Sequence, residues 1–368
     1  PLCENGSIEL NGSIGGAASS ASWTSLNGGA FSDPNSLNST FTPPPGYVGA
    51  ITLTLTTNDP DGPCEATSAD LNLIVLPTPS IDPKSDLFFC NEEVINSITF
   101  TGTNANLFTW TNSNTAIGLP SNGTGAINFT ATNINTSPIT STITITPVNT
   151  ISSTLCPGIP TSFTITIQPE VQVNDIINQT ICNASSTSEI VFSTANTSGI
   201  TSYVWTNDTP SIGLGSNGAG AIPSFTAQNN TNSPLVATIE VTPTYTLNGI
   251  SCSGTPKVFT ITVNPEAQVN TIDDITLCEG STTSAIAFTS LNTIGANTYE
   301  WTNNNTSIGL ANNGIGNIPS FITNNTSTTP EVATITVTPF YNFNGIICNG
   351  EAETFEITIN PNGQVNTI

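Results

Sequence analysis

A frame of one Cys, one Trp and a second Cys occurs four times in this chain and accounts for all eight cysteines and all four tryptophans. Successive first cysteines are separated by 90−3 = 87, 182−90 = 92 and 278−182 = 96 residues, which is close to the size of one small β-sandwich domain. A fixed period of this kind predicts one folding unit copied four times. Its members are Cys3, Trp23 and Cys64; Cys90, Trp110 and Cys156; Cys182, Trp205 and Cys252; and Cys278, Trp301 and Cys348.

The end of each unit repeats as well. The segments SFTITIQPEVQVN (162–174), VFTITVNPEAQVN (258–270) and FEITINPNGQVN (355–366) are near copies of one another. The last copy stops at Ile368, where the earlier ones continue to a new Cys, and Cys3 lacks the lead-in that precedes Cys182 and Cys278. We therefore expect a longer array, and we number the four units repeats 1 to 4. Their expected ranges are 1–79, which diverges from the others, then 80–169, 170–265 and 266–361, with 362–368 beginning a linker to a further repeat.

The charge balance excludes several classes of partner. The net charge is −23, yet only 7% of residues are charged and only two are basic. Two lysines cannot neutralise a phosphate backbone, so nucleic acid is excluded, and an anionic membrane surface repels such a chain. No apolar run approaches the roughly 18 residues of a spanning helix, so we expect no membrane insertion.

The cysteines lack the spacing of a metal site, because the chain has no His and no Cys-x-x-Cys pair. One disulfide per repeat makes every copy equivalent, and disulfides that recur in each unit indicate an oxidising, extracellular or cell-surface location. The expected pairs are Cys3–Cys64, Cys90–Cys156, Cys182–Cys252 and Cys278–Cys348.

Alternating apolar and polar residues predict β-strands. In repeat 4 the segments AIAFTSL (285–291), TYEWT (298–302), IPSFIT (318–323) and VATITVT (332–338) alternate in this way, and clusters of Asn, Gly, Pro and Ser lie between them. No stretch has a helical period. The prediction is an all-β tandem array of four sandwich domains, of about seven strands each, in an extended rod.

The tryptophans have two interpretations. Each lies two residues after an aromatic residue in repeats 2 to 4, which suits a platform for a sugar ring, but its presence in every unit favours a core residue between two sheets. We therefore expect Trp23, Trp110, Trp205 and Trp301 to be core aromatic residues. The Cys to Trp spacing places the first Cys near the first strand and the second Cys in the hairpin before the last strand. A bridge between those strands would carry a pulling force and leave 96−70 = 26 residues of slack per repeat.

The motifs ITLTLTTNDPDGPC (51–64) and the WTN sequences at Trp110, Trp205 and Trp301 resemble Ig-like and PKD-like repeats of giant Bacteroidota cell-surface proteins, in particular SprB-type gliding motility adhesins. The resemblance implies type IX secretion, attachment to the outer membrane, and a role in cell adhesion and gliding. It also implies a cell-surface anchor or motility machinery that binds other parts of the protein. The other expected partners are the neighbouring repeats of the same chain and a polysaccharide or solid surface.

Candidate chemical sites are few. Asp59 and Asp61, beside the turn residue Gly62, are the candidate ligands for calcium, although the same residues form ordinary tight turns. Without His, no nucleophilic triad or Cys–His pair can form, so we expect no enzyme and no other cofactor. Two functions stay open: a structural stalk or filament segment of a surface adhesin, or repeats that are themselves carbohydrate- or surface-binding modules.

Overall fold

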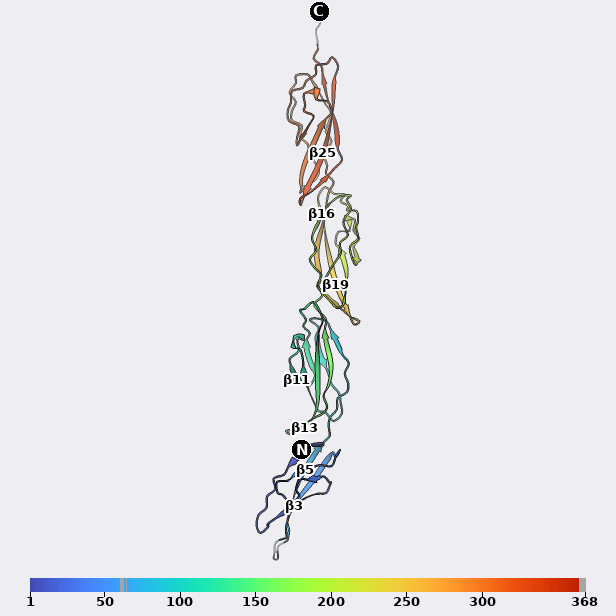
Figure 1. Ribbon diagram of the computed structural model, residues 1–368. Helices are drawn as coiled ribbons and strands as arrows, with labels where there is room; N and C mark the ends of the chain where they lie inside the picture. Colours follow the sequence, from blue (N-terminus) through green and yellow to red (C-terminus); the bar gives the residue numbers. More distant parts are fainter. Residues whose placement is uncertain (60–62, 64, 364–368) are drawn as a thin grey trace, which may run out of the picture. The chain divides into compact units, whose positions relative to one another are not determined.

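The computed structural model describes residues 1–59, 63 and 65–363. By contacts the chain divides into two compact units. Unit 1 comprises Pro1–Glu170 together with the short segments Asn196–Gly199 and Thr246–Cys252, and unit 2 comprises Val171–Ala195, Ile200–Tyr245 and the chain from Ser253 on. Figure 1 shows strands throughout, with the long strands β13 (Ile139–Ile151), β19 (Leu235–Leu247) and β25 (Glu331–Phe343) labelled.

Repeat 1 consists of two sheets around Trp23. The larger sheet has the order β1-β7-β6-β3, and the smaller one has the order β2-β5-β4. The strands are β1 (Leu2–Cys3), β2 (Ile8–Glu9), β3 (Ala21–Ser25), β4 (Ala30–Phe31), β5 (Thr40–Thr42), β6 (Gly49–Thr57) and β7 (Ser68–Leu76).

Repeat 2 has a sheet of order β11-β10-β13-β15-β8, with β14 added to β13, and a separate pair β12-β9. The first strand β8 lies parallel to the last strand β15, whereas the other pairs are antiparallel. The remaining elements are β8 (Leu87–Phe89), β9 (Val94–Ile98), β10 (Leu107–Asn112), the 3-10 helix η1 (Thr115–Ile117), β11 (Asn122–Thr124), β12 (Ile127–Thr130), β14 (Thr154–Pro157) and β15 (Thr161–Ile167).

Repeats 3 and 4 share this plan, with orders β16-β21-β19-β17-β18 and β22-β27-β25-β23-β24. Repeat 3 has β16 (Gln179–Cys182), β17 (Ile200–Asn207), η2 (Pro210–Ile212), β18 (Asn217–Ala219), β20 (Ile250–Ser253) and β21 (Lys257–Asn264). Repeat 4 has β22 (Ile275–Cys278), β23 (Ala296–Asn303), η3 (Thr306–Ile308), β24 (Asn313–Ile315), β26 (Ile346–Asn349) and β27 (Glu353–Asn360).

The second layer of repeats 3 and 4 is less regular than the sequence predicts. The expected strands 285–291 and 318–323 form no continuous ladder: Ile286 makes an isolated bridge with Ile318, and Ile322 makes one with Thr282, which precedes the expected strand. Their apolar residues are nevertheless used, since Phe288 and Ile318 are buried in the core of repeat 4. In these segments the alternating sequence pattern therefore reflects the burial of alternate side chains and not continuous strand pairing.

Each of the four sequence repeats has its own hydrophobic core, and each core contains one of the four tryptophans. The apolar side of the long central strand supplies much of it: Ile143 and Ile145 in β13, and Ala333, Ile335 and Val337 in β25, are fully buried. Four separate cores in one chain define a tandem array of all-β sandwich domains.

Candidate functional site at the repeat junctions

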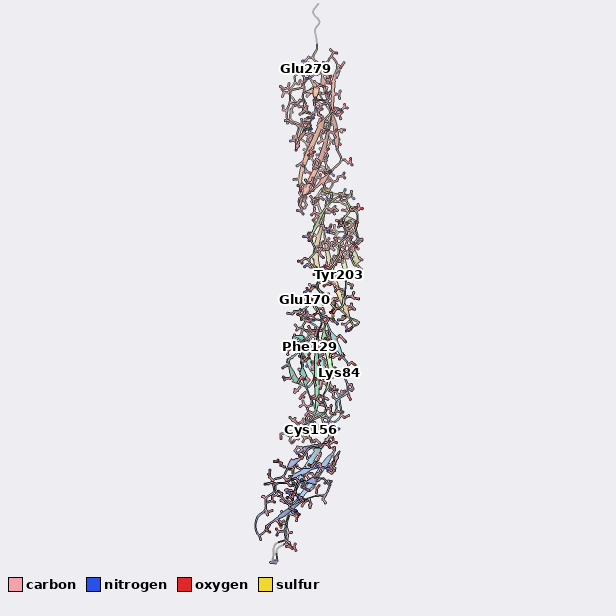
Figure 2. All side chains as sticks on the ribbon, viewed as in Figure 1. Lys84, Phe129, Cys156, Glu170, Tyr203 and Glu279 are labelled. Atoms are coloured by element: carbon pink, nitrogen blue, oxygen red, sulfur yellow. A yellow bond between two sulfur atoms is a disulfide. The ribbon has the colours of Figure 1, made fainter. Side chains whose placement is uncertain are left out.

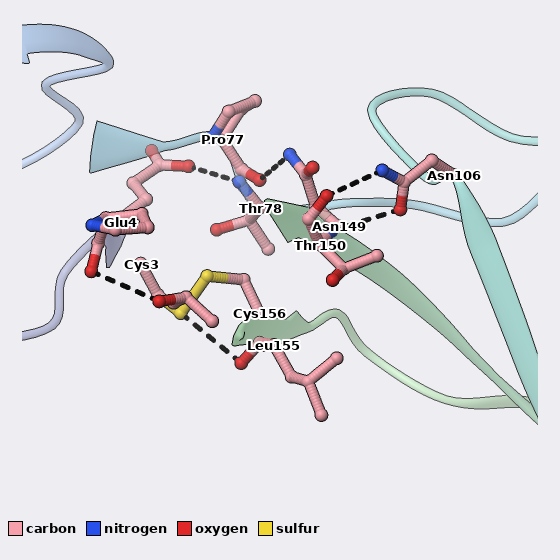
Figure 3. The surroundings of a disulfide bond; sticks show 11 residues. Cys3, Glu4, Pro77, Thr78, Asn106, Asn149, Thr150, Leu155 and Cys156 are labelled. Carbon is pink, nitrogen blue, oxygen red and sulfur yellow. Dashed lines mark hydrogen bonds between the residues drawn. A yellow bond between two sulfur atoms is a disulfide. The ribbon is translucent and has the colours of Figure 1, made fainter. Parts of the chain in front are cut away.

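Three disulfides connect cysteines of different repeats. They are Cys3–Cys156, Cys90–Cys252 and Cys182–Cys348, with Cα–Cα distances of 5.4, 5.6 and 5.5 Å, all within the usual range for a disulfide. In each, the first Cys of one repeat is bonded to the second Cys of the following repeat. Figure 3 shows the first of these bonds, between β1 and β14.

The pairing expected within each repeat, Cys3–Cys64, Cys90–Cys156, Cys182–Cys252 and Cys278–Cys348, is therefore wrong. In repeats 2 to 4 the first and second Cys do lie at the first strand and at the penultimate hairpin strand, but at opposite ends of the repeat. In repeat 2, Cys156 is opposite Asn149 of β13, and Ile167, beside Phe89, is opposite Ile139. Ten residues of β-strand span about 33 Å, which no disulfide can bridge.

The direction of the first strand is the cause of this separation. In all four repeats the first strand runs parallel to the last one: β1 with β7, β8 with β15, β16 with β21, and β22 with β27. A cysteine at the end of the first strand is thus carried to the end of the repeat from which the chain leaves. There it meets the hairpin of the next repeat.

Two cysteines stand outside these bonds. Cys278 at the end of β22 is exposed and is the one free cysteine among the described residues, and Cys64 lies outside the described residues. In the parallel pair of β22 and β27, Cys278 lies opposite Asn360, just as Cys182 lies opposite Asn264 in the pair of β16 and β21. Its backbone position is therefore the one that carries the interdomain bond in repeat 3.

Polar contacts accompany the disulfide between repeats 1 and 2 (Figure 3). The Glu4 carboxylate accepts a hydrogen bond from the Thr78 amide at 2.8 Å, and the Asn149 side-chain amide donates to the Pro77 carbonyl at 3.2 Å. The Thr78 amide lowers the pKa of Glu4 below its usual value. Glu4 thus fixes the connecting segment to repeat 1, and Asn149 fixes it to repeat 2.

The junction between repeats 3 and 4 has its own buried polar contact. Asn264, the last residue of β21, is fully buried, and its side-chain amide donates to the carbonyls of Phe343 and Ile346 at 3.2 and 3.4 Å. These two carbonyls flank the turn of the β25–β26 hairpin that carries Cys348. Both the disulfide and this amide therefore hold the same hairpin.

In unit 1 the disulfide Cys90–Cys252 is accompanied by two further hydrogen bonds. The Asn196 side chain donates to the Glu170 carbonyl at 2.7 Å, and the Thr197 amide donates to the Thr136 carbonyl at 2.8 Å. Gln168, at the position equivalent to Asn264, is fully buried, and its side-chain amide has no hydrogen-bond partner within the described part of the chain.

The connecting segments are packed and not free linkers. Val171 and Ala267 are 4% and 3% exposed, and Val173 belongs to the core of repeat 3. A glycine two residues after the hairpin cysteine lies directly against each segment: a Cβ on Gly158, Gly254 or Gly350 would clash with the carbonyl of Pro79, Val171 or Ala267, respectively. Each junction therefore has a disulfide between consecutive repeats and a connecting segment that packs against a glycine of the following repeat.

We expect Gly350→Ala to destabilise the chain by about 1–3 kcal/mol, because the added methyl group must displace a backbone carbonyl and not a flexible side chain. The midpoint of denaturant unfolding measures this change. Gly15→Ala is the control, because a Cβ there meets no atom within 4 Å. An equal shift in both variants would contradict the close contact at Ala267.

A carboxylate supports the pairing of first and last strands. Asp86, just before β8, accepts a hydrogen bond from the Thr164 amide of β15 at 2.7 Å, and Asn178 and Asp274 make the equivalent bonds to Thr260 and Glu356. The Thr164 amide lowers the pKa of Asp86. The pKa of Asp86 is thus lower in the folded protein than in the unfolded chain. Its contribution to stability is therefore present when the pH is above the pKa of the unfolded chain, and it is lost as the pH falls through the pKa of the folded protein.

The tryptophans lie in the cores, with exposed fractions of 7% for Trp23 and Trp110, 5% for Trp205 and 3% for Trp301. In repeats 2 to 4 each Trp is opposite a glycine on the neighbouring strand: Gly123, Gly218 or Gly314. A Cβ on any of these glycines would clash with the indole ring. This burial leaves the rings no surface for a sugar.

The candidate calcium ligands are only partly described, because Asp61 lies outside the described residues. The side-chain oxygen of the neighbouring Asn58 accepts hydrogen bonds from the amides of Ser19 and Ser20, each at 3.0 Å. No group of three or more His, Cys, Asp or Glu side chains that could hold a metal occurs among the residues that the structure describes. Likewise, no helix in the described ranges has the length and apolar character of a membrane span.

The fold has distant likenesses among solved structures. The human Desmocollin-1 ectodomain is 11% identical with a TM-score of 0.28, covering 98% of this chain and 79% of that one. Drosophila N-cadherin EC1-4 is 12% identical with a TM-score of 0.30, covering 94% and 93%, and the insect immune protein hemolin is 13% identical with a TM-score of 0.27, covering 98% of both chains. No family model and no curated protein matches the sequence.

The cores and the junctions, taken together, define a class of protein. The chain is an all-β tandem array of sandwich domains whose consecutive members are covalently linked through disulfides. Cys156, labelled in Figure 2, is 2% exposed and is bonded to Cys3 of the preceding repeat.

Proposed function

We propose that this chain is a load-bearing segment of the stalk or filament of a large extracellular adhesion protein. The observation that carries the proposal is the disulfide at each of three junctions, which links one repeat to the next in addition to the peptide chain. Three disulfides also require an oxidising compartment for folding, which supports an extracellular location. The repeat boundaries after residues 79, 169 and 265 are part of this proposal.

The parallel pairing of first and last strands supports the same function. Without the disulfides, a pull on the two ends of a repeat would act on its first and last strands in opposite directions. Because the strands are parallel and hydrogen-bonded to each other, the pull is directed along them, and several hydrogen bonds bear it together instead of one after another. Such a pair resists separation better than one opened from an end.

The finer part of the proposal rests on the sequence resemblance. We propose that the parent protein is a SprB-type gliding motility adhesin attached to the outer membrane of a bacterium of the Bacteroidota and exported by type IX secretion. In that case the buried connecting segments limit bending, and the repeats form an extended rod. Small-angle scattering of the chain tests the rod, and a compact particle would contradict it.

The test of the stalk function is adhesion by the isolated chain. We expect no saturable binding to an array of bacterial and plant polysaccharides or to glass, because a stalk positions an adhesive surface that lies elsewhere in the protein. Saturable binding with a dissociation constant in the micromolar range would overturn the stalk function. It would instead support the alternative in which the repeats themselves bind carbohydrate or solid surfaces.

A further inference from the structure

The disulfides change the covalent path along the array. From Cys3 the shortest path crosses to Cys156, follows the chain for 182−156 = 26 residues to Cys182, and crosses to Cys348. Cys3 and Cys348 are 348−3 = 345 residues apart in the sequence, but this path between them contains only 26 residues of peptide chain.

A second path runs beside the first and shares no residue with it. It follows the chain from Cys64 to Cys90, crosses to Cys252, and follows the chain to Cys278. Its two peptide segments also contain 90−64 = 26 and 278−252 = 26 residues. In repeat 2 the first path uses β15 and the second uses β8; in repeat 3 the first uses β16 and the second uses β21. These are the parallel, hydrogen-bonded pairs.

We infer that the array contains two covalent lines that carry tension side by side, and that the body of each sandwich lies outside both lines. Residues 91–155 of repeat 2 and 183–251 of repeat 3 connect one line to the other and do not lie along the direction of pull. This inference deepens the proposed stalk function by identifying the atoms that bear the load.

The lengths make the lines nearly taut in the folded protein. A 26-residue segment at ~3.5 Å per residue reaches about 90 Å, and each disulfide adds a Cα–Cα distance of 5.4 to 5.6 Å. One such segment runs through two consecutive repeats. The central strands β13 and β19 have 13 residues each, which is about 43 Å per repeat at ~3.3 Å per residue. Full extension of a line thus exceeds the length of two folded repeats by little.

The consequence is an array that does not lengthen by unfolding. In an array without disulfides, each repeat that unfolds releases all of its residues as new length. Here the residues between the lines cannot be drawn out while the disulfides are intact, so the cores stay folded under load and each repeat keeps its position in the array.

Single-molecule pulling on the N- and C-terminal ends, with free thiols blocked, tests this inference. We expect the oxidised chain to extend between Cys3 and Cys348 to roughly 100 Å and no further. After reduction, the same segment should reach roughly 1,200 Å in successive unfolding steps, a twelvefold increase. An oxidised segment that reaches roughly 290 Å, as disulfides within each repeat would allow, overturns the inference.

Two variants with paired substitutions separate the lines. Cys90→Ser with Cys252→Ser interrupts only the second line, so the extension between Cys3 and Cys348 should not change. Cys182→Ser with Cys348→Ser interrupts the first line and forces the path through 156−90 = 66 and 348−252 = 96 residues, or roughly 570 Å. Equal extensions in the two variants would overturn the inference. Because the readout is length and not adhesion, the inference and the proposed function can fail separately.

Discussion

Removal of the disulfide between repeats 3 and 4 by Cys182→Ser with Cys348→Ser is expected to lower the free energy of unfolding by roughly 5 kcal/mol. The bond closes a loop with a sequence separation of 166 residues, and restriction of the unfolded chain grows with the logarithm of loop length. Loss of this bond also releases the hairpin whose carbonyls accept from Asn264. Denaturant unfolding with and without a thiol reductant measures the effect.

Cys278→Ser is the matched control for that experiment. Cys278 has the same strand position as Cys182 but is free, so its substitution should leave the unfolding midpoint unchanged. If the cysteines were paired within repeats, Cys278→Ser would cost as much as Cys348→Ser. A loss of stability in the Cys278 variant comparable to that of the paired variant would therefore contradict the interdomain bonds.

Truncation of the core tryptophan of repeat 3, Trp205→Ala, is expected to cost about 3–5 kcal/mol, the usual range for loss of a buried aromatic side chain. Gly218→Ala should destabilise the chain by about 1–3 kcal/mol through overpacking, because its Cβ would overlap the indole ring. Thermal unfolding followed by calorimetry measures both changes.

Gly215→Ala serves as the control, since the nearest atom to its Cβ would lie 3.9 Å away and repeat 4 has Ala311 at the corresponding position. We expect a shift close to zero for this variant. If Gly218→Ala is tolerated as well as Gly215→Ala, the indole ring of Trp205 does not occupy the place under the β17–β18 pair that the structure gives it.

Much of the fold could be predicted from local patterns. Alternation within 332–338 predicted a strand, and β25 continues to Phe343 because its last four residues, from Phe340 on, pair with β26. In repeats 2 to 4 the positions of the cysteines, at the first strand and in the hairpin before the last, also followed from their spacing to Trp. These features depend on neighbours in sequence or on burial of alternate residues, which a single sequence displays directly.

The disulfide partners could not be obtained in this way, because they depend on the direction of the first strand. Disulfides within each repeat and disulfides to the next repeat would both make the repeats equivalent. One signal does separate the two cases. The distance from a second Cys to the following first Cys is 26 residues three times, whereas the distance within a repeat varies from 61 to 70. One of these constant segments, from Cys156 to Cys182, has an interdomain disulfide at both ends.

The junction contacts were beyond sequence analysis for a related reason. The segment QPEVQVN suggested a short linker, but Val171 and Val173 are buried and the segment forms part of the following repeat. The role of Gly350 against Ala267 depends on a backbone approach between residues 83 positions apart (350−267 = 83), which no local pattern records.

Covalent continuity across a cut chain tests the central claim most directly. A protease recognition sequence inserted beside Ile177, which is 84% exposed, allows cleavage between Cys156 and Cys182. The cleaved protein, denatured without reductant, should migrate as one molecule, because Cys90–Cys252 spans the cut; reductant should release two fragments. The variant with Cys90→Ser and Cys252→Ser should separate into two fragments even without reductant. Two fragments from the cleaved parent chain in the absence of reductant would contradict the claim that disulfides join successive repeats.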